Sequence, residues 1–558
     1  MRTTAHRWAA RLVLLVLVLA ATASAQTRPP GAIEPTELRD WLGFIASDEL
    51  QGRQVFTEGL GLAAEYIAQH LSEWHVKPMG DAGTYFQTVK VLGVRTTSHA
   101  SVTLEVNGQR RTFKDGEGVT FPRKMGGTQT IRSHEVQFVG YGVQLPSAHL
   151  DDYAGLQAAG KIVVFLGQGP DVPELSNRLL RTRSRDALAK GAAATIGPVS
   201  NVRPRQKSSD AAADNGDFTT TERYDTPTPP ALTAGDDFYE FLFSGSGVNY
   251  AELKDKAARR EPLPRVSLAN VTLTINVDAD YAVVRTRFTR NVVGSIAGTD
   301  AALRDTYVAF GAHYDHIGYI EGADGPGRGV GLFSTSCPGQ ARDTPRPDDV
   351  INNGADDDGS GTVALMALAK AFALGPKPKS SLLFVWHSGE EAGLYGSRYY
   401  ADHPIVPLDR IAALLNIDMI GRNRCDDPAQ ENTVYLVGSD RISSELHNLN
   451  EDANGALARP LSLNYELNDP ADPESIYTRS DHYSYASKGI PIIFYTTGLH
   501  RDYHFVTDEV SKIDFPKLAR VTELVYATGI RVANLGHLPA RDHKGPRKGR
   551  GGGGRVGT

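Results

Sequence analysis

The chain has 558 residues, more than one ordinary hydrophobic core accommodates, so we expect at least two domains. Hydrophobic residues make up 41% and charged residues 22%, a balance typical of a soluble globular protein. The formal net charge of −6 gives no reason to expect nucleic acid or an anionic membrane as a partner. The two cysteines exclude a zinc site made of four thiolates but allow one disulfide.

The first 25 residues have the pattern of a secretory signal peptide. Arg2, Arg7 and Arg11 form a basic segment, residues 12–21 form a short apolar run, and the Ala-Ser-Ala at 23–25 fits a cleavage site. The apolar run is short for a membrane span. We therefore expect residues 1–25 to be a signal peptide and the mature protein to be exported, periplasmic or extracellular, without stable membrane insertion. A retained N-terminal membrane anchor is the alternative.

Residues 34–286 change character part-way along. In 34–97, Leu60, Ala64 and Ile67 recur at helical spacing, and an alternating strand pattern follows until Arg95 breaks it. From 98 to 286, short β-rich runs are separated by polar stretches rich in Pro and Asp, which indicates a separate small domain. Its candidate strands are 101–106, 136–141, 161–166 and 271–277.

In residues 287–536, strand and helix patterns alternate. This predicts an α/β fold with a mostly parallel, twisted sheet flanked by helices. The candidate strands are 307–311, 381–387, 412–417, 433–437 and 491–495, and the candidate helices are 361–374, 394–401, 443–453 and 515–532. Residues 537–558 are rich in Pro, Gly, Lys and Arg and are expected to be a disordered basic tail. No pattern predicts an oligomeric state.

Polar side chains cluster where the predicted strands end, which is where open parallel sheets bind ligands. Five segments contribute them: His313, Asp315 and His316; Asp357; Glu390 and Glu391; Asp418; and Tyr503 and His504. Each segment alone also fits an ordinary structural role, such as a helix cap or a hydrogen-bonded histidine. Together they favour zinc, which imidazole and carboxylate bind without help from thiolate.

These segments resemble the co-catalytic di-zinc exopeptidases of metallopeptidase family 28. The matching sequences are ASDELQGR at 46–53, GAHYDH at 311–316, GADDDGSG at 354–361, GEEAGLYGS at 389–397, NIDMIGR at 416–422, SDH at 480–482 and YH at 503–504. As an ordered set they are specific, and they extend over most of the chain after residue 25. The resemblance implies a zinc exopeptidase sandwich of helix, sheet and helix layers, with 34–97 and 287–536 forming the catalytic domain.

The resemblance also implies a metal-ligand set for two zinc ions per chain. His313 and Asp418 would hold one zinc, Glu391 and His504 would hold the other, and Asp357 would bridge both. A cis peptide after Asp357 is also implied.

Three further residues have roles implied by the resemblance. Glu390 would act as general base and acid. Asp315 would orient His313, as metal-bound imidazoles generally require. Tyr503 would donate a hydrogen bond to the oxyanion.

The middle region resembles a protease-associated domain inserted into the peptidase. The similar sequences are FVGYGV at 138–143, DDYAGL at 151–156, GKIVV at 160–164 and GAAATI at 191–196. One departure from the compact family members is the Gly- and Pro-rich segment 318–353, which contains Cys337 and either shapes the pocket rim or is a surface insertion. Cys337 and Cys425 both follow motif residues, so we expect a disulfide; two free thiols are the alternative.

The predicted function is that of a secreted metallo-exopeptidase acting on peptides or small proteins. An aminopeptidase is favoured, with a carboxypeptidase or dipeptidase of the same family as alternative, because no residue pattern identifies which terminus is bound. A single-zinc glutaminyl cyclase and a catalytically dead binding protein are further alternatives. The complete ligand set and the general base argue against both.

Overall fold

The computed structural model describes residues 31–145, 148–172, 175, 177–199, 217–220, 226–319, 337, 345, 346, 348–470, 472 and 474–543. The expected signal peptide, most of segment 318–353 and residues 544–558 lie outside this set. Among the described helices, none combines the length and the hydropathy that a bilayer crossing requires.

The larger domain is built on a sheet whose centre is four parallel strands in the order β18, β17, β19, β22. They span Ser381–His387 (β18), Tyr307–His313 (β17), Ile411–Ile417 (β19) and Ile492–Thr496 (β22). β16 (Ala279–Ile296) runs antiparallel to β18, β20 (Thr433–Val437) runs antiparallel to β22, and β21 (Ser462–Asn464) pairs with β20. Every residue of β18 and β19 is buried, as expected of strands covered on both faces.

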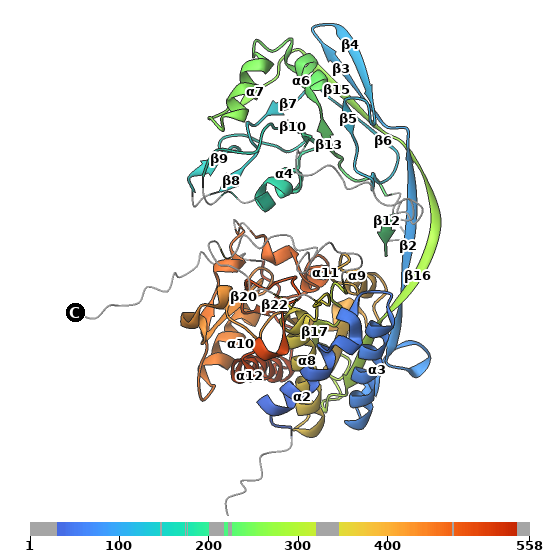
Figure 1. The fold of residues 1–558 in the computed structure, drawn as a ribbon, viewed down its shortest axis with the longest axis vertical. Helices are drawn as coiled ribbons and strands as arrows, with labels where there is room; N and C mark the ends of the chain where they lie inside the picture. The colour runs from blue at the N-terminus through green and yellow to red at the C-terminus, as the bar shows by residue number, and fades with distance from the viewer. Residues whose placement is uncertain are drawn as a thin grey trace, which may run out of the picture.

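Helices cover both faces of this sheet (Figure 1). α2 (Pro35–Ile45), α3 (Glu58–Glu73), α8 (Gly361–Leu374) and α12 (Phe515–Ala533) share one core with Phe310 and Phe384. On the other face, α9 (Tyr395–Asp402) and α11 (His482–Ala486) pack against Leu383 and Leu414. Successive residues of one strand point to opposite faces, so β17 and β18 serve both cores. The predicted α/β fold is confirmed.

The predicted elements of this domain match the observed ones closely. The strands differ by at most two residues at an end, and helices α8 and α12 begin at the predicted residues. α10 (Ser444–Gly455), which packs on α12, runs two residues beyond the predicted end. These strands are long apolar runs between polar turns, which is why the sequence pattern locates them.

Residues between β2 (Phe86–Ser98) and β16 form a second domain with its own hydrophobic core. One antiparallel sheet has the order β4 (Gln109–Lys114), β3 (Ser101–Val106), β15 (Val271–Val277), β6 (Gln129–Ser133). A second has the order β14 (Val266–Ser267), β7 (Val136–Phe138), β10 (Ile162–Val164), β11 (Ala194–Pro198), β13 (Ala231–Ala234), β5 (Val119–Thr120). Its helices are α4 (Asn177–Ala189), α6 (Asp236–Phe243) and α7 (Tyr250–Ala258).

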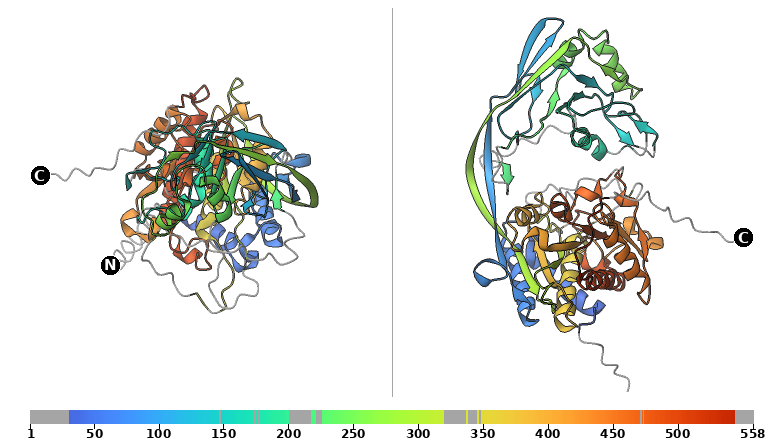
Figure 2. Two further views of the ribbon diagram at one scale, coloured as in Figure 1. Left: turned by 90° about the horizontal axis from the view of Figure 1, so that it is seen from above. Right: turned by 180° about the vertical axis from the view of Figure 1, so that it is seen from behind.

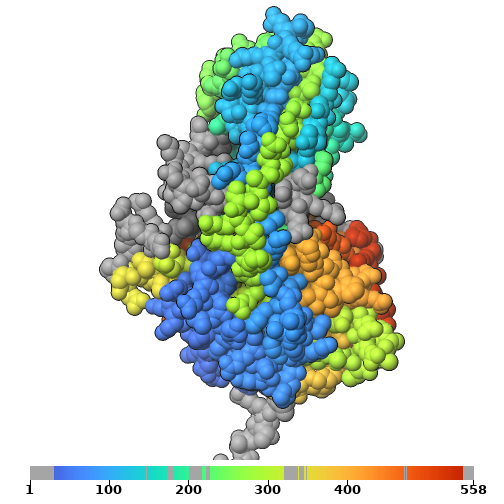
Figure 3. All heavy atoms as spheres, turned by 90° about the vertical axis from the view of Figure 1, so that its right-hand side faces the viewer, coloured from blue at the N-terminus to red at the C-terminus, as the bar shows by residue number. Residues whose placement is uncertain are grey.

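Two long paired strands join the domains. β2 and β16 are antiparallel from the pair Ser98 and Ala279 to the pair Phe86 and Val292. Figures 2 and 3 show this ribbon running from the large domain to the inserted one. The short strand β12 (Asp217–Thr219) pairs with β2 on the way, and β1 (Lys77–Pro78) pairs with the far end of β16.

Three boundaries differ from the sequence-based expectation. β2 continues past Arg95 to Ser98, because Thr96 and Thr97 pair with β16. The expected domain border at residue 286 falls inside β16, which is one strand shared by both domains. Residues 537–543 are not a free tail: the backbone N–H of Ala540 donates to Glu445 on α10.

Candidate metal centre

The candidate ligands come together at the carboxyl ends of the central strands. His313 is the last residue of β17, Asp418 directly follows β19, and Glu391 lies in the turn after β18. Asp357 lies in the short helical segment Ala355–Ser360 before α8, and His504 lies in the loop after β22. The sheet topology therefore places at one edge residues that are up to about 190 positions apart in the chain.

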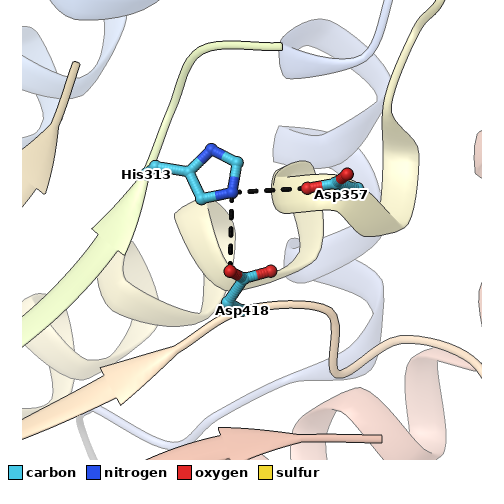
Figure 4. Close-up of side chains that lie close together, drawn as sticks. All are labelled: His313, Asp357 and Asp418. Atoms are coloured by element: carbon cyan, nitrogen blue, oxygen red, sulfur yellow. Dashed lines mark ion pairs between the residues drawn. The ribbon is translucent and has the colours of Figure 1, made fainter. Parts of the chain in front are cut away.

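The first group of ligands consists of His313, Asp357 and Asp418. Nε2 of His313 lies 3.3 Å from Oδ1 of Asp357 and 3.6 Å from Oδ2 of Asp418. Figure 4 shows the imidazole at the strand end with this nitrogen facing both carboxylates. The three side chains are buried and can hold one metal ion.

The second group shares Asp357 with the first. Nε2 of His504 lies 3.0 Å from Oδ2 of Asp357 and 3.0 Å from Oε2 of Glu391. Asp357 thus presents one oxygen to each group, which is the arrangement of a bridging carboxylate. His316, which the sequence reading placed at this edge without a role, also lies in the second group.

Several buried atoms of the second group lack a hydrogen-bond partner in the protein chain. Asp357 Oδ2, Glu391 Oε1 and His504 Nε2 are buried and have no hydrogen-bond partner of acceptable geometry in the described structure. Buried polar atoms in native proteins are normally hydrogen-bonded or bound to an ion. Imidazole and carboxylate donors suit zinc, so the residues present fit a zinc pair.

The electrostatics of the cluster agree with a cation site. Burial by itself raises the pKa of Asp357, yet contacts with His313 and His504 hold it well below its usual range. Burial lowers the pKa of an imidazole, yet Asp418 and Asp357 raise that of His313 well above its usual range. The surrounding carboxylates therefore stabilise positive charge at this position.

Backbone contacts fix the bridging residue. The peptide bond between Asp357 and Asp358 is cis, as the family resemblance implied. Asp508 accepts hydrogen bonds from the backbone N–H of Asp356 and of Asp357. Asp358 accepts from the backbone N–H of His313 at 3.1 Å and so ties the bridge to the end of β17.

Asp315 links the histidine ligand to the two glutamates. Its carboxylate accepts hydrogen bonds from the backbone N–H of Glu390 and of Glu391, at 3.1 and 3.3 Å. Nδ1 of His313 lies 3.1 Å from the backbone oxygen of Asp315 but 3.8 Å from its carboxylate. Asp315 therefore orients His313 through its carbonyl, and its side chain holds the turn that carries the glutamates.

Glu390 and Tyr503 line the same pocket as the first ligand group. The pocket contains His313, Asp357, Glu390, Asp418 and Tyr503. Burial raises the pKa of Glu390 well above its usual range, which suits a group that must accept and release a proton.

Tyr503 is held in that pocket by its neighbours. Its ring stacks on His504 with centroids 3.9 Å apart, and its hydroxyl accepts a hydrogen bond from Arg479 at 3.1 Å. Its own hydroxyl hydrogen is therefore available for a ligand.

The rest of this pocket is largely apolar. It is lined by Met419, Leu467, Ile476, Phe494 and Leu499. A larger hollow near α3 is lined by Phe56, Arg287 and Tyr314, among others, and contains none of the candidate ligands. We assign the function to the smaller pocket because the convergent carboxylates and histidines lie there.

Arg53 supports the site from behind and was given no role at the sequence level. It is fully buried and donates to the backbone oxygens of Ile45, Tyr314, Asn353 and Gly354. The last three belong to the loops that carry His316 and Asp357. Arg53 is the last residue of the ASDELQGR sequence, which resembles the start of family 28 peptidases. That resemblance does not show what the arginine contacts.

Residues 291–529 match the model of the family described as Peptidase family M28. These residues belong to peptidase family M28. All eight residues that the resemblance assigned to the site lie inside the matched range. The M28 region begins within β16 and includes most of the central sheet.

Curated relatives of the chain include proteins named as aminopeptidases. Aminopeptidase Y of Saccharomyces cerevisiae is 28% identical over 276 residues, 46% of this chain and 42% of its own length. Leucine aminopeptidase 2 of Arthroderma otae is 24% identical over 326 residues, 54% of this chain and 55% of its own length. The chain thus spans about half the length of the curated relatives it matches.

Solved structures resemble most of the chain at low identity. An aminopeptidase from Aneurinibacillus sp. strain AM-1 gives a TM-score of 0.44 at 18% identity, with 92% of this chain and 98% of that one covered. BSAP, a zinc aminopeptidase from Bacillus subtilis, gives 0.42 at 16% identity, with 90% and 95% covered.

Proposed function

We propose that the protein is an exported zinc-dependent aminopeptidase that removes residues from the N-termini of peptides. The observation that carries this proposal is the placement of Asp357, which presents one oxygen to each of two ligand groups beside Glu390. Membership of residues 291–529 in family M28 and the two fungal aminopeptidase relatives support the same class.

The five ligands would hold two zinc ions. Glu390 would transfer the proton, and Tyr503 would stabilise the oxyanion. Bound zinc would supply Lewis acidity that polarises the scissile carbonyl and lowers the pKa of a nearby water. Glu390, with its raised pKa, would accept the proton that this water loses and pass it to the leaving amine. The Tyr503 hydroxyl would donate to the carbonyl oxygen as negative charge develops there.

The basic side chains of the pocket favour a substrate with a free N-terminus over one bound by its C-terminal carboxylate. Asp357, Glu390 and Asp418 line it. Of the described lining residues, Arg479 is the one arginine or lysine, and its guanidinium is already paired with Glu474 at 3.1 Å and bonded to Tyr503. The described lining residues therefore offer a C-terminal carboxylate no unpaired basic side chain, which favours substrates that present a free N-terminus.

The apolar part of the pocket favours a substrate with an apolar terminal side chain. Leu467, Ile476 and Phe494 lie beside the ligands and would remove such a side chain from water. The relative named leucine aminopeptidase 2 is consistent with this preference.

We further propose that the inserted domain is a protease-associated domain that borders the substrate path. Arg185 of α4 donates to the hydroxyl of Thr478 at 3.1 Å, next to the pocket residue Arg479. Peptides longer than a few residues would pass along this contact.

A peptide panel tests the proposed function. The zinc-loaded protein would be given Leu-Gly-Gly, its N-acetyl form, its C-terminal amide and a peptide that begins with glutamine. We expect release of leucine from the free and amidated peptides and no cleavage of the acetylated one. Cleavage of the acetylated peptide from its C-terminus would indicate a carboxypeptidase, and formation of pyroglutamate without hydrolysis would indicate a cyclase.

A further inference from the structure

The imidazole of His316 is buried and makes no hydrogen bond of acceptable geometry in the described structure. Its side chain has no exposed surface, and neither Nδ1 nor Nε2 has a hydrogen-bond partner in the described structure. Leaving a buried polar group unsatisfied is unfavourable, so such an imidazole indicates a partner that the protein chain does not supply.

The polar atoms nearest the imidazole of His316 belong to the second ligand group. Nδ1 of His316 lies 3.0 Å from Oε1 of Glu391 and 3.9 Å from Oδ2 of Asp357. Both of those oxygens, together with Nε2 of His504, also have no hydrogen-bond partner. The second ligand group thus contains four buried atoms that could bind a metal ion and that have no hydrogen-bond partner. They are Nδ1 of His316, Oε1 of Glu391, Oδ2 of Asp357 and Nε2 of His504.

Their spacing fits a tetrahedral metal site. Ligand atoms about 2.0–2.2 Å from a shared zinc, at tetrahedral angles, lie about 3.4 Å from one another. The contacts among the four residues range from 3.0 to 3.9 Å. Nδ1 of His316 lies 3.0 and 3.9 Å from its two carboxylate oxygens, and Nε2 of the expected ligand His504 lies 3.0 Å from each of its two, so both imidazoles are within about half an ångström of that spacing.

The fold holds the His316 ring in this place. Its backbone N–H donates to the oxygen of Arg53 at 3.1 Å, and Tyr314, two residues earlier, accepts from the Arg53 side chain. The ring also packs against Gly354, where an added Cβ would lie 2.5 Å from Cγ of His316 and 2.3 Å from the oxygen of Asp357. Gly354 has a φ of 56°, so a larger residue there would be strained as well as crowded.

We propose that His316 is a fourth protein ligand of the second metal ion, together with Asp357, Glu391 and His504. This inference rests on the proposed function, since it concerns the metal pair of that same site. It makes the two positions unequal: the second has four protein ligands, and the first has His313, Asp357 and Asp418 among the described residues. Sites with four protein ligands are closed, whereas sites with three keep a position for water or substrate. The second position therefore binds zinc more tightly and fills first.

The test on the natural protein counts imidazoles by X-ray absorption. With both positions filled, the proposal predicts three histidine ligands for two zinc ions, from His313, His316 and His504. Two histidine ligands for two zinc ions would overturn it. A crystal structure of the zinc-loaded protein gives the same answer, since a ligating Nδ1 lies about 2.0–2.1 Å from zinc.

A variant series measures the consequence. His316→Ala and His316→Gln would be titrated with zinc in competition with a chromogenic chelator, and His447→Ala, which removes a buried histidine on α10, is the matched control. We expect one of the two zinc affinities to fall by more than the roughly 10–100-fold typical of losing an outer-sphere partner. The other affinity and the control should stay near those of the natural protein.

The outcomes separate this inference from the proposed function. Two unchanged affinities in both His316 variants, with circular dichroism showing native folding, would refute the fourth ligand and leave the aminopeptidase intact. If the natural protein bound no zinc pair, the proposed function would fail as well. If the variants did not fold, the imidazole count on the natural protein would still decide.

Discussion

The adjacent glutamates after β18 occupy different places at the site. Glu391 contacts His504 at 3.0 Å in the second ligand group, whereas Glu390 lines the pocket beside the first group. We therefore expect Glu390→Gln to keep two zinc ions and to lose about 10²–10⁴ in kcat, because it removes proton transfer. Glu391→Gln should weaken one zinc instead. Steady-state kinetics with elemental analysis distinguish the two, and zinc loss in Glu390→Gln would mean that the roles are reversed.

Tyr503→Phe tests the oxyanion role. The substitution removes the hydroxyl but keeps the ring that stacks on His504. Losing one such donor typically costs about 10²–10³ in kcat, and KM should change little because the contact strengthens in the transition state. Tyr465→Phe removes the hydroxyl of a half-buried tyrosine that bonds to Glu451 and is not among the residues lining the ligand pocket, so it serves as control. A Tyr503→Phe enzyme with natural kcat would exclude the hydroxyl from the reaction.

At the scale of single residues, the candidate ligands that stand in recognisable motifs are those that the sequence predicted. His313, Asp357, Glu391, Asp418 and His504 all converge in the structure. His316 was noted in the sequence but received no role. A histidine that follows an acidic residue can have many roles, and its neighbours in space are needed to distinguish them.

At the scale of structural elements, Arg53 joins the N-terminal segment to the loops that hold the site. Burial lowers its pKa to about 10, although nearby carboxylates oppose this shift, and it still donates to four backbone oxygens. A lysine cannot reproduce the planar fork of donors. Arg53→Lys should therefore reduce the free energy of unfolding by about 2–4 kcal/mol, since a buried carbonyl without a donor costs about 1–3 kcal/mol.

Chemical denaturation followed by circular dichroism measures this effect. Arg110→Lys is the matched control, because Arg110 has 69% of its side chain exposed. Equal stability of the two variants would show that the Arg53 hydrogen bonds are dispensable.

The disulfide links a segment beyond β17 to the turn after β19. Cys337 and Cys425 are joined across 88 positions of sequence, with their Cα atoms 5.2 Å apart. Thiol titration of the denatured, unreduced protein should find no free thiol. Replacing both cysteines by serine should cost about 2–5 kcal/mol of stability, because the bond restricts the unfolded chain. Two free thiols in the purified protein would contradict the bond.

The sequence did not locate the ends of the two long strands, β2 and β16, whose lengths depend on pairing with each other. β2 extends beyond the residues that its alternation predicts, and β16 was not among the predicted strands, because the two support each other by pairing along Phe86–Ser98 and Ala279–Val292. Local composition shows a break at Arg95, but only the partner strand determines where β2 ends.

At the scale of the whole molecule, the inserted domain should be separable. The two main cores of the catalytic domain contain no described buried residue from 99–278, and the same holds for the lining of the ligand pocket. Ser98 and Ala279 are paired neighbours, so a two-residue turn can replace the insertion. We expect the shortened protein to fold, bind two zinc ions and cleave leucine p-nitroanilide. A folded but metal-free product would show that the insertion helps to build the site.

The central claim is that a zinc pair bridged by Asp357 serves an aminopeptidase. Its most direct test is a titration of the metal-free natural protein with zinc while leucine p-nitroanilide hydrolysis is followed, with the N-acetylated anilide in parallel. We predict that activity rises to a maximum at two equivalents and that the acetylated substrate is not cleaved. Full activity at one equivalent, or equal cleavage of the acetylated substrate, would contradict the claim.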